Sequence, residues 1–349
     1  MKGSTRWISL VLALVMLTAL AVPTASAQEG SILDQVRARG SLICGVNGGL
    51  PGFGYLDPDT GDMLGFDADF CRALAAAIFG EVTANNLVFV QLTAAERFTA
   101  LQNRQVDVLF RNATWTVQRD AELGLEFGPV NFYDGQGVMV PRALGVGELD
   151  DMDGASICVL TGTTTELNIT EAMEKRGFTY ELVKFERPAE TIGGLEEGRC
   201  DGLTSDVSQL AGLRSGTADP GRYIILPDII SKEPLGPAYI EGDPVWADVV
   251  KWTVYATIQA EEYGITSVHI DEYVGSTDAA IQRFLGQGDQ ASGSLLGLDN
   301  DFVVNVIRAV GNYGEIFERN VGINTPLALG RGLNALWTDG GLHYPPPWR

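Results

Sequence analysis

Residues 87–110 read LVFVQLTAAERFTALQNRQVDVLF, and this stretch indicates the fold class. Leu87–Gln91 is a short apolar run that predicts a strand. The tetrad Thr-Ala-Ala-Glu at 93–96 has the spacing of a capping box, which predicts a helix through Leu101. Val106–Phe110 predicts a further strand. The stretch therefore predicts a strand, a helix and a strand in that order.

The segment before this stretch adds a strand and a helix. Ser41–Val46 predicts a strand, and Asp67 is expected to cap an amphipathic helix. Phe70, Leu74 and Ile78 fall on one face of that helix. Strands that alternate with helices predict a mostly parallel sheet flanked by helices, so this region is expected to be an α/β unit.

A second segment repeats the same order of elements. Its predicted elements are the strand Ala155–Leu160, a helix from the capping box at 163–166 to about Lys175, the strand Tyr180–Phe185, a helix that begins at Pro188, and the strand Cys200–Leu203. The two segments also share a spacing, because Leu101-x5-Asp107 recurs as Leu195-x5-Asp201. Two such units predict two similar α/β lobes. Beyond Ile230 the pattern is mostly helical, with helices expected at Trp246–Tyr263, Asp301–Val310 and Pro326–Trp337.

The N-terminus has the pattern of an export signal. Lys2 and Arg6 precede the apolar run Ile8–Val22, and the small residues of 25–27 follow it. The run is shorter than the roughly 20 residues of a membrane span, although an uncleaved anchor is the alternative. We expect residues 1–27 to be a cleaved signal peptide, and the protein to be periplasmic or extracellular.

Composition and cysteine usage narrow the class further. The formal net charge of −21 is unfavourable for binding nucleic acid. Four cysteines allow three pairings, and their grouping favours the disulfides Cys44–Cys71 and Cys158–Cys200, with four buried thiols as the alternative. Two histidines and no Cys-x-x-Cys motif disfavour zinc, and we expect no metal and no cofactor.

Polar residues follow several of the predicted strands, where open α/β sheets bind their ligands. A free amino acid needs a cation or aligned N–H groups for its carboxylate and an anion for its ammonium. The candidate ligand-binding residues at these strand ends are Asn47, Leu50, Asn112, Thr114, Arg119, Thr163, Thr164, Ser205 and Asp206. Taken singly, Arg119 could be a surface ion pair, Asp206 a helix cap, and the threonines only a capping box.

The chain resembles the periplasmic amino-acid-binding proteins of ATP-driven importers, and most closely their general L-amino-acid-binding subgroup. The motifs that carry the resemblance are Cys44–Phe53, Gly65–Cys71, Glu96–Gln102, Arg111–Arg119, Gly162–Leu167, Gly198–Asp201, Ile230–Pro237 and Gly332–Trp337. The resemblance implies a two-lobed clamp that captures free L-amino acids, with broad specificity, and delivers them to the permease of an ABC importer. It also implies crossings between the lobes at Asp134–Val140 and Ile229–Ala238.

The resemblance further implies an organisation and residue roles. The first lobe would comprise 28–137 and, with a helical C-terminal extension, 233–349, and the second lobe 138–232. Arg119, which follows a Thr-x-Thr turn containing Thr114, would hold the ligand carboxylate together with the amides at Thr163 and Thr164. Asp206 would hold the ammonium, and the loop of Asn47 and Leu50 would face the side chain. A monomer is expected. The alternatives are an exported lyase or dehydratase on the same clamp fold and a ligand-presenting sensor.

Overall fold

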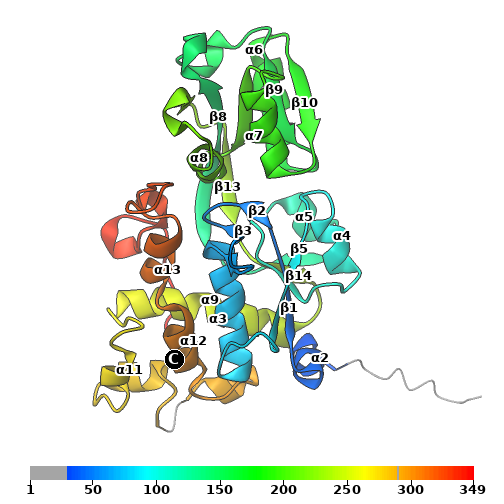
Figure 1. The fold of residues 1–349 in the computed structure, drawn as a ribbon. Helices are drawn as coiled ribbons and strands as arrows, with labels where there is room; N and C mark the ends of the chain where they lie inside the picture. Colours follow the sequence, from blue (N-terminus) through cyan, green and yellow to red (C-terminus); the bar gives the residue numbers. More distant parts are fainter. Residues whose placement is uncertain (1–29, 289–290) are drawn as a thin grey trace, which may run out of the picture. The chain divides into compact units, whose positions relative to one another are not determined.

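The computed structural model describes residues 30–288 and 291–349 (Figure 1). The expected signal peptide lies outside the described residues. In the part of the chain that is described, no helix is both long and apolar enough to cross a membrane.

The first lobe is built on a five-stranded sheet with the strand order β5-β1-β6-β14-β7. Its strands are β1 (Leu42–Val46), β5 (Leu87–Gln91), β6 (Val108–Leu109), β7 (Leu125–Phe127) and β14 (Ala238–Ile240). β1 pairs in parallel with β5 and β6, as the repeat predicts, and β14 pairs antiparallel with β6 and β7. α2 (Ile32–Arg39) precedes β1, and the helices between the strands are α3 (Phe66–Phe79), α4 (Arg97–Gln102) and α5 (Val117–Ala121). A small antiparallel sheet of β2 (Gly49–Leu50), β3 (Gly54–Leu56) and β4 (Met63–Leu64) follows β1.

The second lobe repeats this plan with the strand order β10-β9-β11-β8-β12. Its strands are β8 (Phe132–Pro141), β9 (Ser156–Leu160), β10 (Glu181–Phe185), β11 (Gly202–Asp206), β12 (Tyr223–Ile225) and β13 (Ser231–Leu235), which pairs with β8. The helices are α6 (Thr164–Arg176), α7 (Pro188–Glu196) and α8 (Val207–Ser215). β8 and β13 run antiparallel to each other. β8 follows β7 of the first sheet in the sequence, and β13 is followed by β14 of the first sheet.

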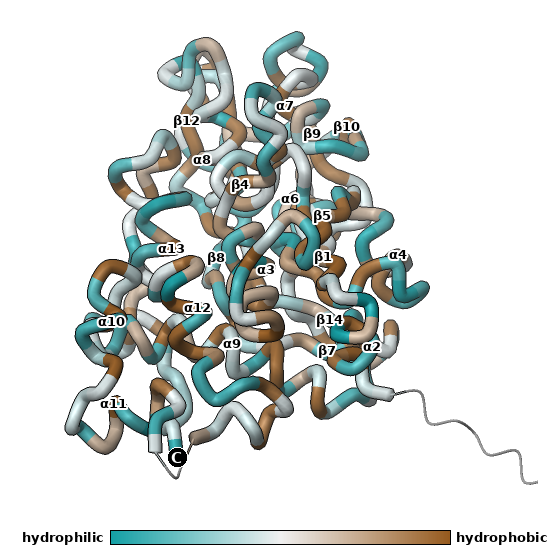
Figure 2. The backbone as a smooth tube through the Cα atoms, turned by 60° about the horizontal axis from the view of Figure 1, so that its bottom comes forward, coloured by the Kyte–Doolittle hydropathy of each residue, from teal (hydrophilic) through white to brown (hydrophobic). Residues whose placement is uncertain are grey.

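Helices dominate the chain after β14. They are α9 (Pro244–Glu262), α10 (Ile270–Tyr273), α11 (Ala279–Phe284), α12 (Phe302–Val310) and α13 (Tyr313–Asn320). α12 and α9 pack against α3 of the first lobe. The hydrophobic segments, brown in Figure 2, include β1, which lies inside the first large sheet.

Three local predictions were wrong. Asp67 does not cap α3, because Gly65 is the N-cap residue and Asp67 lies inside the first turn. Residues 326–337 contain no α-helix, since Pro326 and two glycines interrupt the pattern and only short 3-10 turns form after them. β11 extends to Asp206, so Ser205 and Asp206 end this strand rather than follow it.

The two predicted disulfides are present. Cys44–Cys71 joins β1 to α3, and Cys158–Cys200 joins β9 to the segment that leads into β11. Each disulfide therefore lies within one lobe and is attached to an interior strand of its sheet.

Candidate functional site

A small cavity lies where strands of both sheets end. Residues of the first lobe form one wall, and α6, β11 and α8 of the second lobe form the other. Its lining residues are Arg97, Arg111, Asn112, Thr114, Leu160, Thr163, Thr164, Thr165, Ser205, Asp206 and Gln209. Six of the nine predicted site residues line this cavity, namely Asn112, Thr114, Thr163, Thr164, Ser205 and Asp206.

Asp206 carries a buried carboxylate that is available to a ligand. It is the N-cap residue of α8, but its side chain caps no amide, so the helix-cap interpretation is wrong. Its exposed fraction is 5%, and no described residue donates a hydrogen bond to the carboxylate. Burial raises its pKa well above the usual range, and the nearby Asp134 and Glu233 add to the effect. A cationic group of a ligand would offset the free-energy cost of burying the ionised carboxylate.

The start of α6 presents backbone amides to the cavity. Thr163 is the N-cap residue, and its hydroxyl accepts from the Glu166 amide at 3.1 Å and donates to the Leu160 carbonyl at 2.7 Å. The capping interpretation is therefore correct for this side chain. The amides of Thr164 and Thr165 occupy the first turn, where no intrahelical acceptor exists. These N–H groups can bind an anion.

Glu233 on β13 connects the two lobes, and sequence reasoning did not select it. Its Oε2 accepts from the hydroxyl of Thr114 at 2.6 Å and from that of Thr164 at 2.9 Å. Its Oε1 accepts from Asn168 Nδ2 at 2.9 Å. Thr114 belongs to the first lobe, whereas Thr164 and Asn168 belong to α6. No local pattern identifies such a residue, because its partners are distant in sequence.

Arg119 is buried beside the cavity rather than in its lining. Its exposed fraction is 8%, which rules out a surface ion pair. The guanidinium donates from Nη1 to the Thr114 carbonyl at 2.8 Å and lies 4.9 Å from the ring centroid of Phe98. Burial lowers its pKa, while Glu233 and Asp206 oppose the shift. Its role as a ligand-carboxylate partner stays a prediction.

Two further arginines line the cavity, and sequence reasoning missed both as site residues. Arg97 and Arg111 are each 2% exposed. Arg111 donates from Nε to the Leu92 carbonyl at 2.9 Å and from Nη1 to Asn112 Oδ1 at 3.3 Å, but its Nη2 has no partner among the described residues. Arg97 lies 4.7 Å from the Phe98 centroid, and its Nε likewise has no partner there. Both arginines fall within the sequence motifs quoted above, and Arg111 directly follows the predicted strand Val106–Phe110, whereas Arg97 lies within the predicted helix that begins at the 93–96 capping box.

Asn112 adopts a left-handed backbone conformation, with φ of 34°, that a non-glycine residue seldom takes. Its amide donates to Asp67 Oδ2 at 2.9 Å, which holds this conformation, and its Nδ2 donates to Gln209 of α8 at 3.1 Å. Burial raises the pKa of Asp67 to about 7, although the Asn112 amide and Arg111 both lower it. Asp67 thus positions the cavity wall instead of capping α3.

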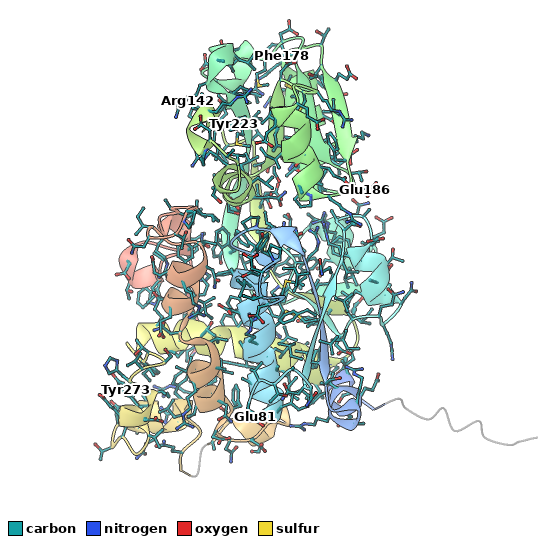
Figure 3. The ribbon with its side chains drawn as sticks, viewed as in Figure 1. Glu81, Arg142, Phe178, Glu186, Tyr223 and Tyr273 are labelled. Carbon is teal, nitrogen blue, oxygen red and sulfur yellow. A yellow bond between two sulfur atoms is a disulfide. The ribbon has the colours of Figure 1, made fainter. Side chains whose placement is uncertain are left out.

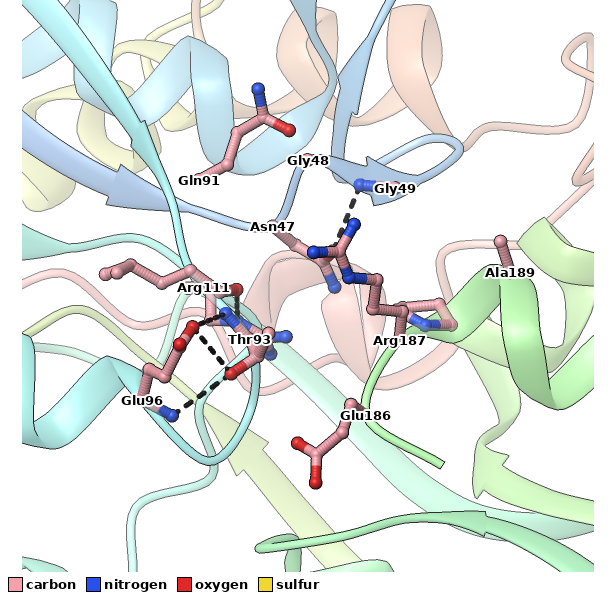
Figure 4. Close-up of a pocket in the computed structure, with 12 residues that line it drawn as sticks. Asn47, Gly48, Gly49, Gln91, Thr93, Glu96, Arg111, Glu186, Arg187 and Ala189 are labelled. Atoms are coloured by element: carbon pink, nitrogen blue, oxygen red, sulfur yellow. Dashed lines mark hydrogen bonds between the residues drawn. The ribbon is translucent and has the colours of Figure 1, made fainter. Parts of the chain in front are cut away.

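A larger chamber adjoins the cavity, and Arg111 belongs to the lining of both (Figure 4). Asn47 lines this chamber with the Thr93–Glu96 turn of the first lobe. Its other wall includes Glu186, labelled in Figure 3, and Arg187, both of which precede α7 of the second lobe. Leu50 is fully buried in β2 and lines neither space, so the structure does not bring it to the site.

Two α/β lobes with a charged cavity between their strand ends define a two-lobed solute receptor of the periplasmic-binding-protein fold. A structure described as "ABC transporter / periplasmic binding protein from Brucella ovis with glutathione bound" has a TM-score of 0.88 and 49% identity, over 91% of this chain and 99% of that one. The general L-amino acid-binding periplasmic protein AapJ of Rhizobium johnstonii is 50% identical over 93% of this chain and 95% of its own length.

A third relative is the glutamate/glutamine/aspartate/asparagine-binding protein BztA of Rhodobacter capsulatus, 49% identical over 95% of this chain and 97% of its own length. Residues 42–146 match the family of bacterial extracellular solute-binding proteins, family 3. The chain belongs to this family. The expected family and fold are confirmed by these similarities.

Proposed function

We propose that this protein is an extracytoplasmic receptor that captures free L-amino acids and delivers them to an ABC importer. One observation carries the proposal: the same cavity is lined by a buried carboxylate, Asp206, and by buried guanidinium N–H groups that have no hydrogen-bond partner among the described residues. Burying such charged groups costs free energy unless a ligand of complementary charge pairs with them. An amino acid zwitterion has that complement. The names of AapJ and BztA support this ligand class.

In the proposed complex each lobe holds part of the zwitterion. Asp206 and Ser205 of the second lobe receive the ammonium. The amides at Thr163 and Thr164 receive the α-carboxylate, with Thr114 and Arg119 on the first-lobe side. Asn112 lines the cavity and Asn47 lines the adjoining chamber, where the ligand side chain would extend. The polar and glycine-rich lining of that chamber suits a broad range of side chains.

Closure of the two lobes around the ligand is the expected mechanism. We propose lobe boundaries at 28–137, 138–232 and 233–349, with β8 and β13 as the two connections. A ligand that contacts both lobes binds the closed form more tightly, and it shifts the population by that difference in affinity. The closed form of a monomer would then be presented to the permease. Members of the family are periplasmic, which supports export after removal of residues 1–27.

Calorimetry on Asp206→Asn tests the assignment. The substitution keeps the size of the side chain and removes the charge that pairs with the ammonium. We expect the loss of a buried ion pair to weaken amino-acid binding by at least about 100-fold, equivalent to about 3 kcal/mol. Asp219→Asn, at an exposed turn of the same lobe, is the matched control and should bind normally.

Unchanged affinity in Asp206→Asn, together with a normal melting profile, would remove Asp206 from the site.

Incubation of the wild-type protein with a bound amino acid, followed by NMR of the released ligand, addresses the lyase alternative. We expect the ligand to be recovered unaltered, because a receptor for transport must release what it binds. Formation of an elimination product would instead favour a clamp-fold enzyme.

A further inference from the structure

The two strands that connect the lobes, β8 and β13, form one antiparallel ribbon, and the second lobe holds one end of it. Gln136 of β8 is in register with Asp206 of β11. The Gln136 side chain is fully buried, and its Nε2 donates to the Thr165 carbonyl at 2.8 Å and to the Thr204 hydroxyl at 2.9 Å. This residue therefore fixes the second-lobe end of the ribbon.

The opposite end of the ribbon is the cross-strand pair Tyr133 and Pro234, and it is held on both of its outer edges. On the β13 side, the Pro234 carbonyl accepts from the Trp115 amide at 2.9 Å. On the β8 side, Asn334 Oδ1 accepts from the Tyr133 amide at 2.7 Å, and Asn334 Nδ2 donates to the Tyr133 carbonyl at 3.0 Å. One side chain from the C-terminal segment thus replaces a neighbouring strand along this edge of β8.

Asn334 is itself fixed to the helices that pack against the first sheet. Its exposed fraction is 5%, and its carbonyl accepts from Nε and Nη2 of Arg331, each at 3.0 Å. The same guanidinium forms an ion pair with Glu261 of α9, with N–O distances of 2.8 and 3.0 Å. Because α9 packs against α3 of the first lobe, Arg331 and Asn334 link that lobe to the backbone of β8.

Only two cross-strand pairs separate the end that holds Tyr133 from the end that holds Gln136. They are Asp134–Glu233 and Gly135–Lys232, and among the described strands neither pair is in register with a third one. A rotation of one lobe relative to the other would therefore be concentrated in these two pairs. Without Asn334, the freely rotating part of β8 would extend further toward the first lobe.

We propose that Asn334 is a positioning residue for lobe closure, because it fixes the first-lobe end of the connecting ribbon and so limits the orientations that the lobes can take. The inference rests on the proposed function, in which the lobes close around the ligand. A shorter rotating segment has fewer conformations to lose on closure. A larger share of the unliganded molecules is then able to close, and the apparent affinity rises in proportion to that share.

Asn334→Ala tests this role against a matched control. The substitution removes both hydrogen bonds to the Tyr133 backbone, and Asn334 lines neither the cavity nor the adjoining chamber. Asn86→Ala is the control. The Asn86 carboxamide likewise accepts from one backbone amide, that of Thr83 at 2.8 Å, and donates to one carbonyl, that of Glu81 at 3.0 Å. These contacts lie between α3 and β5, away from the ribbon.

Distances between the lobes provide the first measurement. Nitroxide labels at Thr60→Cys of the first lobe and Glu174→Cys of the second, both at exposed positions, report these distances by double electron–electron resonance. Without ligand, we expect Asn334→Ala to give a broader distance distribution than the wild type and Asn86→Ala to match the wild type. Equal distributions in the two variants would overturn the inference, whether or not the protein binds an amino acid.

Stopped-flow kinetics with L-glutamate, L-glutamine and L-alanine provide the second measurement. We expect Asn334→Ala to release its bound amino acid about tenfold faster than the wild type, and Asn86→Ala to remain within about twofold. An unchanged release rate in Asn334→Ala would overturn the inference and leave Asn334 with a structural role only. If the wild type binds none of the three, the proposed function fails, and the distance distributions alone decide the inference.

Arg331→Lys replaces Asn334→Ala in both measurements if that variant does not fold. Lysine keeps a cation beside Glu261 but lacks the planar fork that also donates to the Asn334 carbonyl. The distance distribution should broaden and the release rate should rise, each by less than is expected for Asn334→Ala. Wild-type distances and kinetics in Arg331→Lys would then overturn the inference.

Discussion

At the residue scale, the site is organised by buried charged groups that have few partners within the protein. Asp206 and Arg97 make few contacts of their own, whereas Asp67 and Glu233 use their carboxylates to hold neighbouring residues in place. Because burial disfavours the ionised form of a carboxyl group, the pKa values of Asp67 and Asp206 lie above the usual range of an aspartate. Stability and binding should therefore both depend on pH.

The raised pKa of Asp67 determines the direction in which the free energy of unfolding changes with pH. Its pKa is raised from 3.8 to about 7 in the folded protein. The stabilisation linked to its protonation is present at low pH and is lost as the pH rises through about 7. From about pH 5 to about pH 8, the wild type should lose at least about 1 kcal/mol more unfolding free energy than Asp67→Asn, which cannot titrate.

Urea unfolding of both proteins at the two pH values measures this difference. Asp134, whose pKa is raised to about 6, is present in both proteins and so cancels from the comparison. Parallel pH profiles for the wild type and Asp67→Asn would show that Asp67 is ionised throughout the range.

At the element scale, the two lobes share one hydrogen bond pattern near the start of their first parallel strands, β1 and β9. Asp107 Oδ2 accepts from the Ile43 amide of β1 at 2.7 Å, and Asp201 Oδ2 accepts from the Ser156 amide of β9 at 2.8 Å. These are the two aspartates of the repeated Leu-x5-Asp spacing. The repeat is therefore confirmed as a structural repeat, in which each aspartate ties the last helix–strand connection to the first strand.

The disulfides also act at the element scale. Cys44–Cys71 closes a sequence separation of 27 residues and Cys158–Cys200 one of 42. Closing such loops restricts the unfolded chain, so replacement of Cys158 and Cys200 by alanine should lower the unfolding free energy by about 4 kcal/mol. Denaturant unfolding of the double variant measures the loss. A decrease below about 1 kcal/mol would mean that native-state packing compensates for the constraint.

At the scale of the whole molecule, contacts between the lobes surround the cavity. Thr114 and Thr164 share the carboxylate of Glu233, and Asn112 donates to Gln209. α8 of the second lobe also approaches the β2–β3 turn of the first lobe closely: a Cβ built at Gly212 would lie 2.7 Å from the Pro51 carbonyl oxygen. Gly212 is therefore needed for the two lobes to meet in this arrangement.

Gly212→Ala should separate helix stability from lobe closure. Alanine favours a helix interior over glycine by about 0.5–1 kcal/mol, yet its methyl group would hold the lobes apart. We expect unchanged or higher thermal stability without ligand, and amino-acid affinity lower by about tenfold. Gly193→Ala, in α7 with open space around the built Cβ, is the control and should bind normally.

Small-angle scattering with saturating ligand should show a larger radius of gyration for Gly212→Ala than for Gly193→Ala. Wild-type affinity and compaction in Gly212→Ala would mean that the lobes close with a wider gap at this point.

The sequence by itself determined the order of elements, the two α/β units and the disulfide pairs, because periodicity, capping residues and spacing act over short stretches of chain. It also placed Asp206 and the Thr163–Thr164 turn at strand ends, where ligands of such sheets bind. The tertiary structure alone decided that Arg97, Arg111 and Glu233 join them and that Leu50 does not. Their positions depend on which distant segments share a buried volume, and the cost of burying charge there has no local signature in the chain.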